Sequence, residues 1–399
     1  MEKMHLAVFN TQPPHLYFGG VERRIVEVAK RLSDKVDTRV YSGTKKGFRK
    51  ICKVEKITFI PCFSTDTVFP MDNWFFNKTI SRMGNAIKAD AYEAHTASGL
   101  GFLKALRKRQ VTKPFILTIH GVLADEYATA IKDELATLRT RLSHFPMWHL
   151  SQVEKESAKR ATLIVTVSKY SSEKIVQFYN VDGTKIRVVP NGVDLEKFKP
   201  REKSEIVKHR IRADNKQRVL FVGRLVPRKG LSFLIEAAAQ VVKENKETEF
   251  IVAGDGPLKN HLIAFSRKQG VFDNFVFLGN VPDETLPALY RRTDVFALPS
   301  TQEGQGLALL EAQATGKPVV AFNVGAISES VLNRKTGLLV RPDADELADA
   351  ILNLLSNESL RKRMGHYGRE FVSENFSWDI CAKKMFQVYL EAIGLLRSS

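Results

Sequence analysis

The sequence has no apolar run long enough to cross a membrane. Its longest apolar stretches, such as Phe115–Ile119 and Leu163–Val167, have the length of single strands, far short of the roughly 20 residues of a spanning helix. Residues 1–5 lead directly into a predicted strand and show no signal-peptide pattern. We therefore expect a cytoplasmic protein.

Cysteine is scarce, with Cys52, Cys62 and Cys381 as the only three in 399 residues. Their spacing fits neither a metal site nor a disulfide framework, so we expect buried free thiols in a reducing compartment. The one Asp-x-Asp, at residues 343–345, follows Arg-Pro and opens a predicted helix, where capping explains it. No metal site is expected.

Acidic residues are depleted in the first half of the chain. Residues 1–200 hold 33 Lys and Arg against 20 Asp and Glu, which accounts for most of the net charge of +17. The densest basic stretches are Lys45–Lys56 and Lys104–Arg109. Such a surface attracts an anionic membrane, a lipid phosphate or nucleic acid. Nucleic acid is not expected, because no binding module accompanies the charge; a merely solvated basic surface stays open as the alternative.

Short β-branched runs alternate with amphipathic helical patterns in two successive stretches. This alternation predicts an α/β protein with two Rossmann-like, doubly wound parallel sheets, expected to face each other across a cleft. We predict an N-terminal domain at 1–200, a C-terminal domain at 201–380, and a helix at 381–399 that packs back across the boundary. The predicted strands are 5–10, 38–42, 57–61, 91–95, 115–120, 163–168 and 186–190, then 219–223, 249–253, 275–278, 295–299, 319–323 and 337–340.

Two predicted strand ends carry the elements of a phosphate site. The strand at 219–222 leads into Gly223, Arg224, Lys229 and a helix start. Glycine allows close backbone approach, a helix N-terminus favours anions, and the cations add charge-assisted contacts. The pair Gly19-Gly20 precedes another helix in the same way. Each loop alone is also explained by ordinary surface cations or a simple turn.

Two glutamates follow the strand at 295–299. Glu303 lies in a glycine-flanked turn, and Glu311 comes eight residues later in the next predicted helix. A fully helical segment would separate them by about 12 Å along the axis, too far for a two-carboxylate hydrolase. The spacing suits one acid on a sugar and one on the ribose of a nucleotide. Between them, the amides of residues 305–307 can meet a phosphate.

Taken in order, these motifs resemble glycosyltransferase family 4. The signature is Glu303-x7-Glu311, and its companions are Gly19-Gly20, Thr118–Gly121, Val167-Ser168, Pro190–Asp194, Gly223–Gly230 and Gly254–Pro257. The resemblance spans residues ~4–380 and implies the GT-B fold. It also implies a retaining hexosyltransferase of polysaccharide or glycolipid biosynthesis. The donor would be a UDP- or GDP-sugar in the C-terminal domain, and a saccharide or lipid-linked acceptor would bind the N-terminal domain.

The resemblance also implies roles for single residues. Arg224 and Lys229 would hold the diphosphate, Glu303 the donor sugar, Glu311 the ribose, and His120 a sugar hydroxyl near the reacting carbon. The remaining donor contacts would come from Gly20, Gly223, Val281, Gln305, Gly306 and Leu307. No cofactor or metal is implied, because cationic side chains replace Mg²⁺.

The sequence departs from the family pattern at Gln305, where phenylalanine is usual, and at the Val324–Ala326 turn. A nucleotide-sugar epimerase of the same fold and an inactive sugar-nucleotide-binding protein are the alternatives. The basic first half and the segment Cys62–Phe76, read as an apolar loop, lead to a further hypothesis. The enzyme would then dock peripherally on the inner membrane face, although a buried loop is the alternative.

Overall fold

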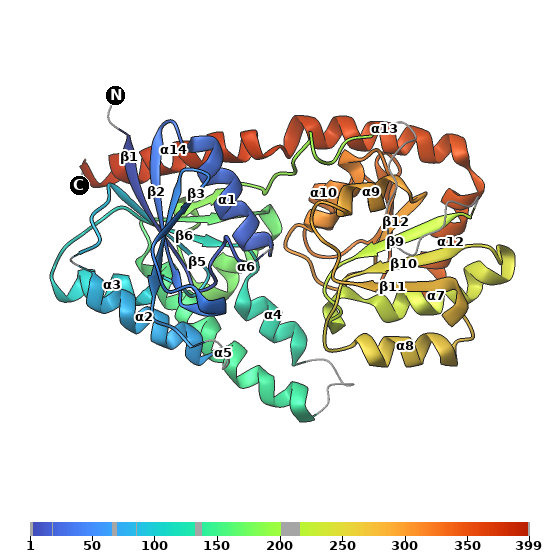
Figure 1. Ribbon diagram of the computed structural model, residues 1–399, viewed down its shortest axis with the longest axis horizontal. Coiled ribbons are helices and arrows are strands. Elements are labelled where there is room, and N and C mark those ends of the chain that lie inside the picture. The colour runs from blue at the N-terminus through green and yellow to red at the C-terminus, as the bar shows by residue number, and fades with distance from the viewer. Residues whose placement is uncertain are drawn as a thin grey trace. The chain divides into compact units, whose positions relative to one another are not determined.

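The computed structural model describes residues 3–17, 19–65, 70–84, 86–131, 138–200 and 216–397. The chain forms two compact units (Figure 1). Unit 1 comprises Met1–Asn191 and Trp378–Ser399, and unit 2 comprises Gly192–Ser377. The changeovers therefore fall at 191/192 and 377/378, against the predicted 200/201 and 380/381.

Unit 1 is built on an eight-stranded sheet in the order β3-β4-β2-β1-β5-β6-β7-β8. All neighbouring pairs are parallel except β3–β4. The strands are β1 (Met4–Asn10), β2 (Val36–Gly43), β3 (Cys52–Val54), β4 (Ile57–Cys62), β5 (Ala91–His95), β6 (Phe115–Ile119), β7 (Leu163–Thr166) and β8 (Ile186–Val188).

Helices cover this sheet in two groups, each with its own apolar cluster. One cluster joins α1 (Gly20–Leu32) and the C-terminal helix α14 (Trp378–Arg397) to the sheet. The other involves α2 (Met71–Met83), α3 (Leu100–Lys108), α5 (Leu138–Arg160) and α6 (Lys169–Tyr179). The helix α4 (Leu123–Ala130) follows β6. Because α14 supplies Trp378, Met385 and Tyr389 to the first cluster, the last residues of the chain complete the core of unit 1.

Unit 2 has a six-stranded sheet in the order β11-β10-β9-β12-β13-β14, with all pairs parallel. Its strands are β9 (Arg218–Val222), β10 (Glu249–Ala253), β11 (Phe275–Gly279), β12 (Val295–Leu298), β13 (Val319–Phe322) and β14 (Gly337–Val340). Its helices are α7 (Leu231–Glu244), α8 (Lys259–Lys268), α9 (Leu286–Arg291), α10 (Leu307–Ala314), α11 (Ile327–Ser330), α12 (Ala344–Ser356) and α13 (Glu358–Asn375). The two doubly wound parallel sheets confirm the predicted fold class.

Several predicted elements need correction. The strand β3 was not predicted, because three residues that pair antiparallel at an edge show no clear alternation. Residues 71–76 begin the helix α2 instead of extending a loop, and residues 66–69 of that segment lie outside the described residues.

Candidate functional site

The loop after β9 has the phosphate-site elements that the sequence predicted. Arg224 is exposed, and Lys229 ends a single 3₁₀ turn before Gly230 and α7. Gly230 has φ +64°, and a Cβ there would lie 1.8 Å from the Pro299 carbonyl oxygen. Only glycine allows the β9 and β12 loops to approach this closely. The glycine therefore holds Lys229 next to the end of β12.

Glu303 and Lys229 meet as an ion pair at this edge of the sheet. The Lys229 ammonium donates to Glu303 Oε1, and the Ser300 hydroxyl donates to the same oxygen at 2.9 Å. Both charged side chains are largely buried, with 17% and 7% of their surface exposed. Burial alone would raise the pKa of Glu303, but Lys229, Arg228 and these hydrogen bonds outweigh it and hold the pKa below its ordinary value. Glu303 is thus a buried carboxylate that accepts hydrogen bonds.

The backbone of Glu303 is fixed by the turn that departs from the family pattern. The Ala326 amide donates to the Glu303 carbonyl oxygen at 3.0 Å. Gly325 has φ +55°, and a Cβ there would lie 2.4 Å from that same oxygen. Sequence reasoning left the role of this turn open; the structure makes it the backbone support of Glu303. Its signal in the sequence was a glycine two residues after the end of a predicted strand.

Glu311 lies within α10, and its side chain is separated from solvent. It is 4% exposed, and the Tyr290 hydroxyl donates to its Oε2 at 2.8 Å. Residues 304–306 are not helical, and α10 begins only at Leu307, with Gly306 at φ +80° before it. Glu303 therefore lies in a turn before the helix, as predicted, and the 12 Å rise of a fully helical segment does not apply to this pair. Gln305 is buried, and its carbonyl oxygen accepts from the Ser330 hydroxyl at 3.0 Å.

The ends of β10 and β11 lie beside the end of β9. Gly223 bonds through its amide to the Ala253 carbonyl at 3.0 Å, and a Cβ on Gly254 would lie 1.9 Å from the Gly223 oxygen. The Gly254 amide in turn donates to Gly279, two residues before the half-buried Val281. These contacts bring the ends of β9, β10 and β11 together, as the carboxyl-end rule requires. In unit 2, every predicted site residue therefore lies in the loop that follows a strand or in the helix that comes after that loop.

In unit 1, the predicted site residues are Gly20 and His120. Gly20 opens α1 behind Gly19, which occupies the N-cap position without a side-chain cap. His120 directly follows β6 and is half-buried. Its Nε2 lies 3.0 Å from Nδ1 of His95 at the end of β5. His95 ends the predicted strand 91–95, but the sequence analysis assigned it to no site, because only the pairing of β5 with β6 brings the two rings together.

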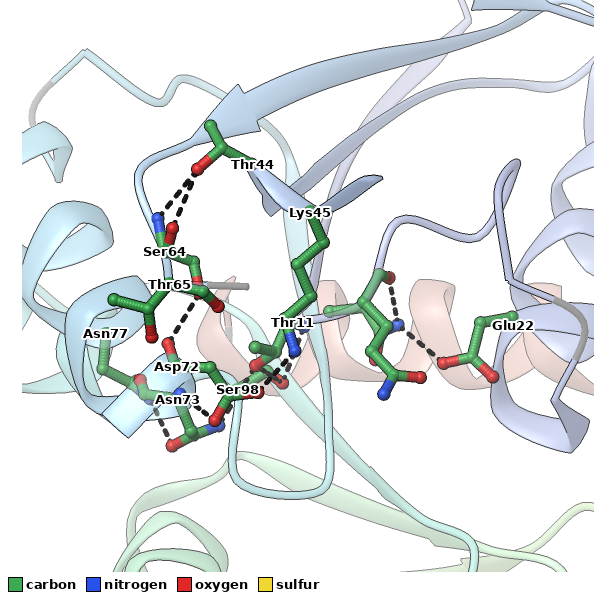
Figure 2. Close-up of polar contacts among 12 residues, drawn as sticks. Thr11, Glu22, Thr44, Lys45, Ser64, Thr65, Asp72, Asn73, Asn77 and Ser98 are labelled. Carbon is green, nitrogen blue, oxygen red and sulfur yellow. Dashed lines mark hydrogen bonds and ion pairs between the residues drawn. The ribbon is translucent and has the colours of Figure 1, made fainter. Parts of the chain in front are cut away.

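Buried polar side chains gather at the carboxyl ends of β1, β2, β4 and β5 (Figure 2). Lys45 is 5% exposed and pairs with Asp72, which is 8% exposed, at the start of α2. The Thr11 and Ser98 hydroxyls lie 2.9 Å apart, and Asn73 donates to Thr11 at 3.1 Å. Lys45 therefore does not belong to the exposed basic stretch in which the sequence placed it. The charges of Lys45 and Asp72 compensate each other inside unit 1.

The Asp-x-Asp motif caps a helix in the structure. Asp343 caps α12 by accepting from the amides of Asp345 and Glu346, as predicted. No cluster of potential metal ligands occurs among the residues that the structure describes. In the same part of the chain, all three cysteines are free thiols, with Cys52 only partly buried. None of the described helices has the length and apolar character needed to cross a membrane.

Two family models match the chain in succession. The model for Glycosyltransferase Family 4 covers residues 18–197, and that for Glycosyl transferases group 1 covers residues 202–371. An uncharacterized glycosyltransferase of Methanocaldococcus jannaschii is 29% identical over 74% of each chain. A GDP-mannose-dependent phosphatidylinositol monomannoside mannosyltransferase of Mycobacterium tuberculosis is 32% identical over 60% of this chain and 65% of its own. The match to a D-inositol 3-phosphate glycosyltransferase of Salinispora tropica, at 34% identity, spans 53% of that relative.

Solved structures share the fold at low sequence identity. A sucrose-phosphate synthase from Thermosynechococcus elongatus superimposes with a TM-score of 0.82 at 21% identity, covering 100% of both chains. Anabaena HepE in complex with UDP and glucose gives a TM-score of 0.74 at 20% identity over 97% of this chain and 100% of its own. At these identities the likeness establishes the fold alone.

Proposed function

Because the chain belongs to the group 1 glycosyl transferases of glycosyltransferase family 4, we propose that it moves a hexose from a UDP- or GDP-sugar to a saccharide or lipid-linked acceptor. Configuration at the anomeric carbon is retained, and the reaction needs no metal. Unit 2 binds the donor, and unit 1 binds the acceptor and places His120 near the sugar.

The buried Lys229–Glu303 pair carries this proposal. A carboxylate that accepts from Lys229 and Ser300 and has a lowered pKa is well suited to bind donor-sugar hydroxyls. The same features make it a weak nucleophile and a weak base. In the proposed mechanism, the departing phosphate oxygen therefore takes the proton of the acceptor hydroxyl on the same face of the sugar, which accounts for retention. Glu303 does not form a bond to the anomeric carbon.

Cationic side chains supply the charge that a metal would otherwise provide. Arg224 is exposed in the loop after β9. Lys229, in the same loop, donates to Glu303, which follows β12. Two cations beside a diphosphate stabilise the negative charge that develops on the leaving group. Gly20 of unit 1 and the amides of Gly306 and Leu307 add uncharged donors. Glu311, buried beside Tyr290, would accept from the ribose hydroxyls.

The donor is the first point to test. The relatives point to two bases, since one is named as GDP-mannose-dependent and HepE was solved with UDP-glucose. Thermal-shift and slow-hydrolysis measurements with UDP- and GDP-hexoses, in EDTA, should identify one donor that stabilises the protein and is slowly hydrolysed. Glu303→Ala should abolish the hydrolysis, whereas the exposed Glu284→Ala should leave it unchanged. If no donor binds with or without Mg²⁺, the transferase proposal fails. If a donor binds but is never hydrolysed or transferred, an inactive sugar-nucleotide-binding protein becomes the better description.

A lipid-linked acceptor and docking on an anionic inner leaflet form the second part of the proposal. Lys50 and Lys53 are exposed around Ile51, whose side chain is 67% exposed. Phe63 and Trp74 are likewise more than half exposed, at 58% and 52%. Cations beside exposed apolar groups are the composition of an interfacial surface.

Sedimentation with vesicles that contain anionic lipid should show binding that weakens with salt. The double variant Lys50→Glu/Lys53→Glu should bind less than the charge-matched Lys243→Glu/Lys268→Glu, whose exposed lysines lie in unit 2. Equal binding of the two variants, or no binding at low salt, would remove the membrane from the proposal while leaving the donor chemistry intact.

A further inference from the structure

A chain of buried polar groups leads from the C-terminal helix to His120. The Tyr389 hydroxyl on α14 donates to Glu93 Oε2 at 2.6 Å. The Thr118 hydroxyl on β6 donates to Glu93 Oε1, also at 2.6 Å. That Oε1 lies 3.4 Å from His95 Nε2, and His95 Nδ1 lies 3.0 Å from His120 Nε2. Tyr389, Glu93 and His95 have almost no contact with solvent, at 1%, 3% and 1% exposed.

The order of donors and acceptors along this row of side chains favours one position for the ring proton of each histidine. The Glu93 carboxylate receives hydrogen bonds on both oxygens and can only accept. An acceptor 3.4 Å from His95 Nε2 favours the tautomer with the proton on that nitrogen. His95 Nδ1 then holds a lone pair and must accept, so His120 Nε2 must donate. The remaining ring nitrogen of His120, Nδ1, is left with its lone pair.

We propose that Tyr389, Glu93 and His95 are positioning residues that set the tautomer of His120, so that its Nδ1 accepts a hydrogen bond from a hydroxyl of the bound sugar. The sugar part of this inference rests on the function proposed above. The tautomer itself depends only on unit 1. Tyr389 is 296 residues from Glu93 in the sequence, and the first 191 residues alone would lack it.

Burial is the main reason that the two imidazole rings are neutral. Burial lowers the pKa of His95 to about 4, with Glu93 opposing the shift and Arg24 on α1 adding to it. Burial, His95 and Arg24 hold the pKa of His120 well below its ordinary value. Cys381 and Tyr389 are the other titratable groups that α14 brings to this region. Near neutral pH, both imidazoles are therefore uncharged, and one of them must donate to the other.

The space around Glu93, His95 and Tyr389 is too small to admit a substrate. The cavity beside Arg24, Glu93, His95 and Tyr389 has a volume of about 10 Å³, room for about one water molecule. Glu93 and Tyr389 therefore act on a reaction only through His95 and His120. They are positioning groups, and a sugar would contact only His120.

Nitrogen NMR of the full-length chain labelled with ¹⁵N-histidine tests the tautomer without a substrate. The chain has nine histidines, and single His95→Asn and His120→Asn variants assign the two signals. We expect both rings to carry the proton on Nε2 between pH 6 and 8. A His120 ring protonated on Nδ1 in the wild type would overturn the proposal.

Tyr389→Phe removes the hydroxyl that donates to Glu93 Oε2, so the Glu93 carboxylate is no longer held in place beside His95 Nε2. We expect a new population of His120 with the proton on Nδ1. Tyr92→Phe is the matched control, since its buried hydroxyl bonds the Ile87 carbonyl and the Ala89 amide on the same unit. Identical histidine signals in the two variants would count against the proposal.

Donor hydrolysis connects the tautomer to the reaction. With UDP-glucose or GDP-mannose, whichever the wild type hydrolyses, Tyr389→Phe should lower kcat about tenfold with KM nearly unchanged, the effect of one misdirected hydrogen bond. Tyr92→Phe should keep full activity. If the wild type hydrolyses neither donor, the proposed function fails while the NMR result still decides the tautomer. If the tautomer shifts and kcat does not, the link from His120 to the sugar is wrong.

Discussion

The two units hold their site residues by different means. In unit 2, glycines bring backbone segments into direct contact: Gly230 against Pro299, Gly254 against Gly223 and Gly325 against Glu303. In unit 1, contacts between buried side chains hold the residues in place: His95 contacts His120, and Asp72 pairs with Lys45. A backbone support depends on residue size and φ, whereas a side-chain support depends on charge and protonation. The two units should therefore respond to different substitutions.

The largest effect is expected from removing a side-chain support in unit 1. Asp72→Asn leaves Lys45 buried without its counter-charge, which should lower the free energy of unfolding by about 3–5 kcal/mol. Urea unfolding followed by circular dichroism measures it. Asp34→Asn is the control, because the Lys56–Asp34 pair is 66% and 86% exposed and should contribute less than about 1 kcal/mol. Equal losses would mean that burial does not distinguish these pairs.

The second largest effect is expected on catalysis, from the loss of the exposed Arg224 in unit 2. Arg224→Ala should lower turnover about 10²–10³-fold, the cost of one transition-state charge contact, with little change in stability because Arg224 is exposed. Lys259→Ala, which removes a cation paired with Asp255, should have a small effect. Turnover of Arg224→Ala close to that of the wild type would remove Arg224 from the mechanism.

Glycine substitutions test the backbone supports directly. Gly325→Ala must adopt φ +55° and place a Cβ 2.4 Å from the Glu303 oxygen. Gly270→Ala must adopt φ +72° with nothing within 4 Å, so it incurs only the conformational cost of about 1 kcal/mol. We expect Gly325→Ala to be less stable than the control and to bind the donor more weakly, as calorimetry can measure. If both variants behave alike, the contact with Glu303 does not matter.

The last expected effect depends on pH and concerns the buried Glu154 of α5. Burial raises its pKa to about 8, against hydrogen bonds from Tyr179 and the Leu123 amide. The folded protein therefore keeps a proton that the unfolded chain releases above its ordinary pKa of about 4.3, so this group lowers stability as pH rises from there towards 8. Relative to the wild type, Glu154→Gln should gain about 3 kcal/mol between pH 5 and pH 8, because each pH unit in this window changes the difference by up to about 1.4 kcal/mol. A thermal-denaturation series from pH 5 to 8 that shows no such divergence would contradict the raised pKa.

The same contrast explains what the sequence could predict. Site residues of unit 2 belong to contiguous motifs such as Gly223–Gly230, whose glycines and cations are close in sequence, and these were predicted together. The partner of His120 was not, since His95 and Tyr389 join it only through strand pairing and the return of α14. The burial of Lys45 was missed for a related reason: a lysine within a basic stretch gives no sign that Asp72 faces it.

The return of α14 to unit 1 also affects how the protein is made. Trp378, Met385 and Tyr389 belong to the core of unit 1, yet a ribosome synthesises them only after all of unit 2. At typical elongation rates this delay lasts roughly ten to forty seconds. During that time the apolar surface of α1 and its strands has no final partner. Nascent unit 1 is thus exposed to chaperones and to aggregation until the last helix emerges, although unit 2 is already complete.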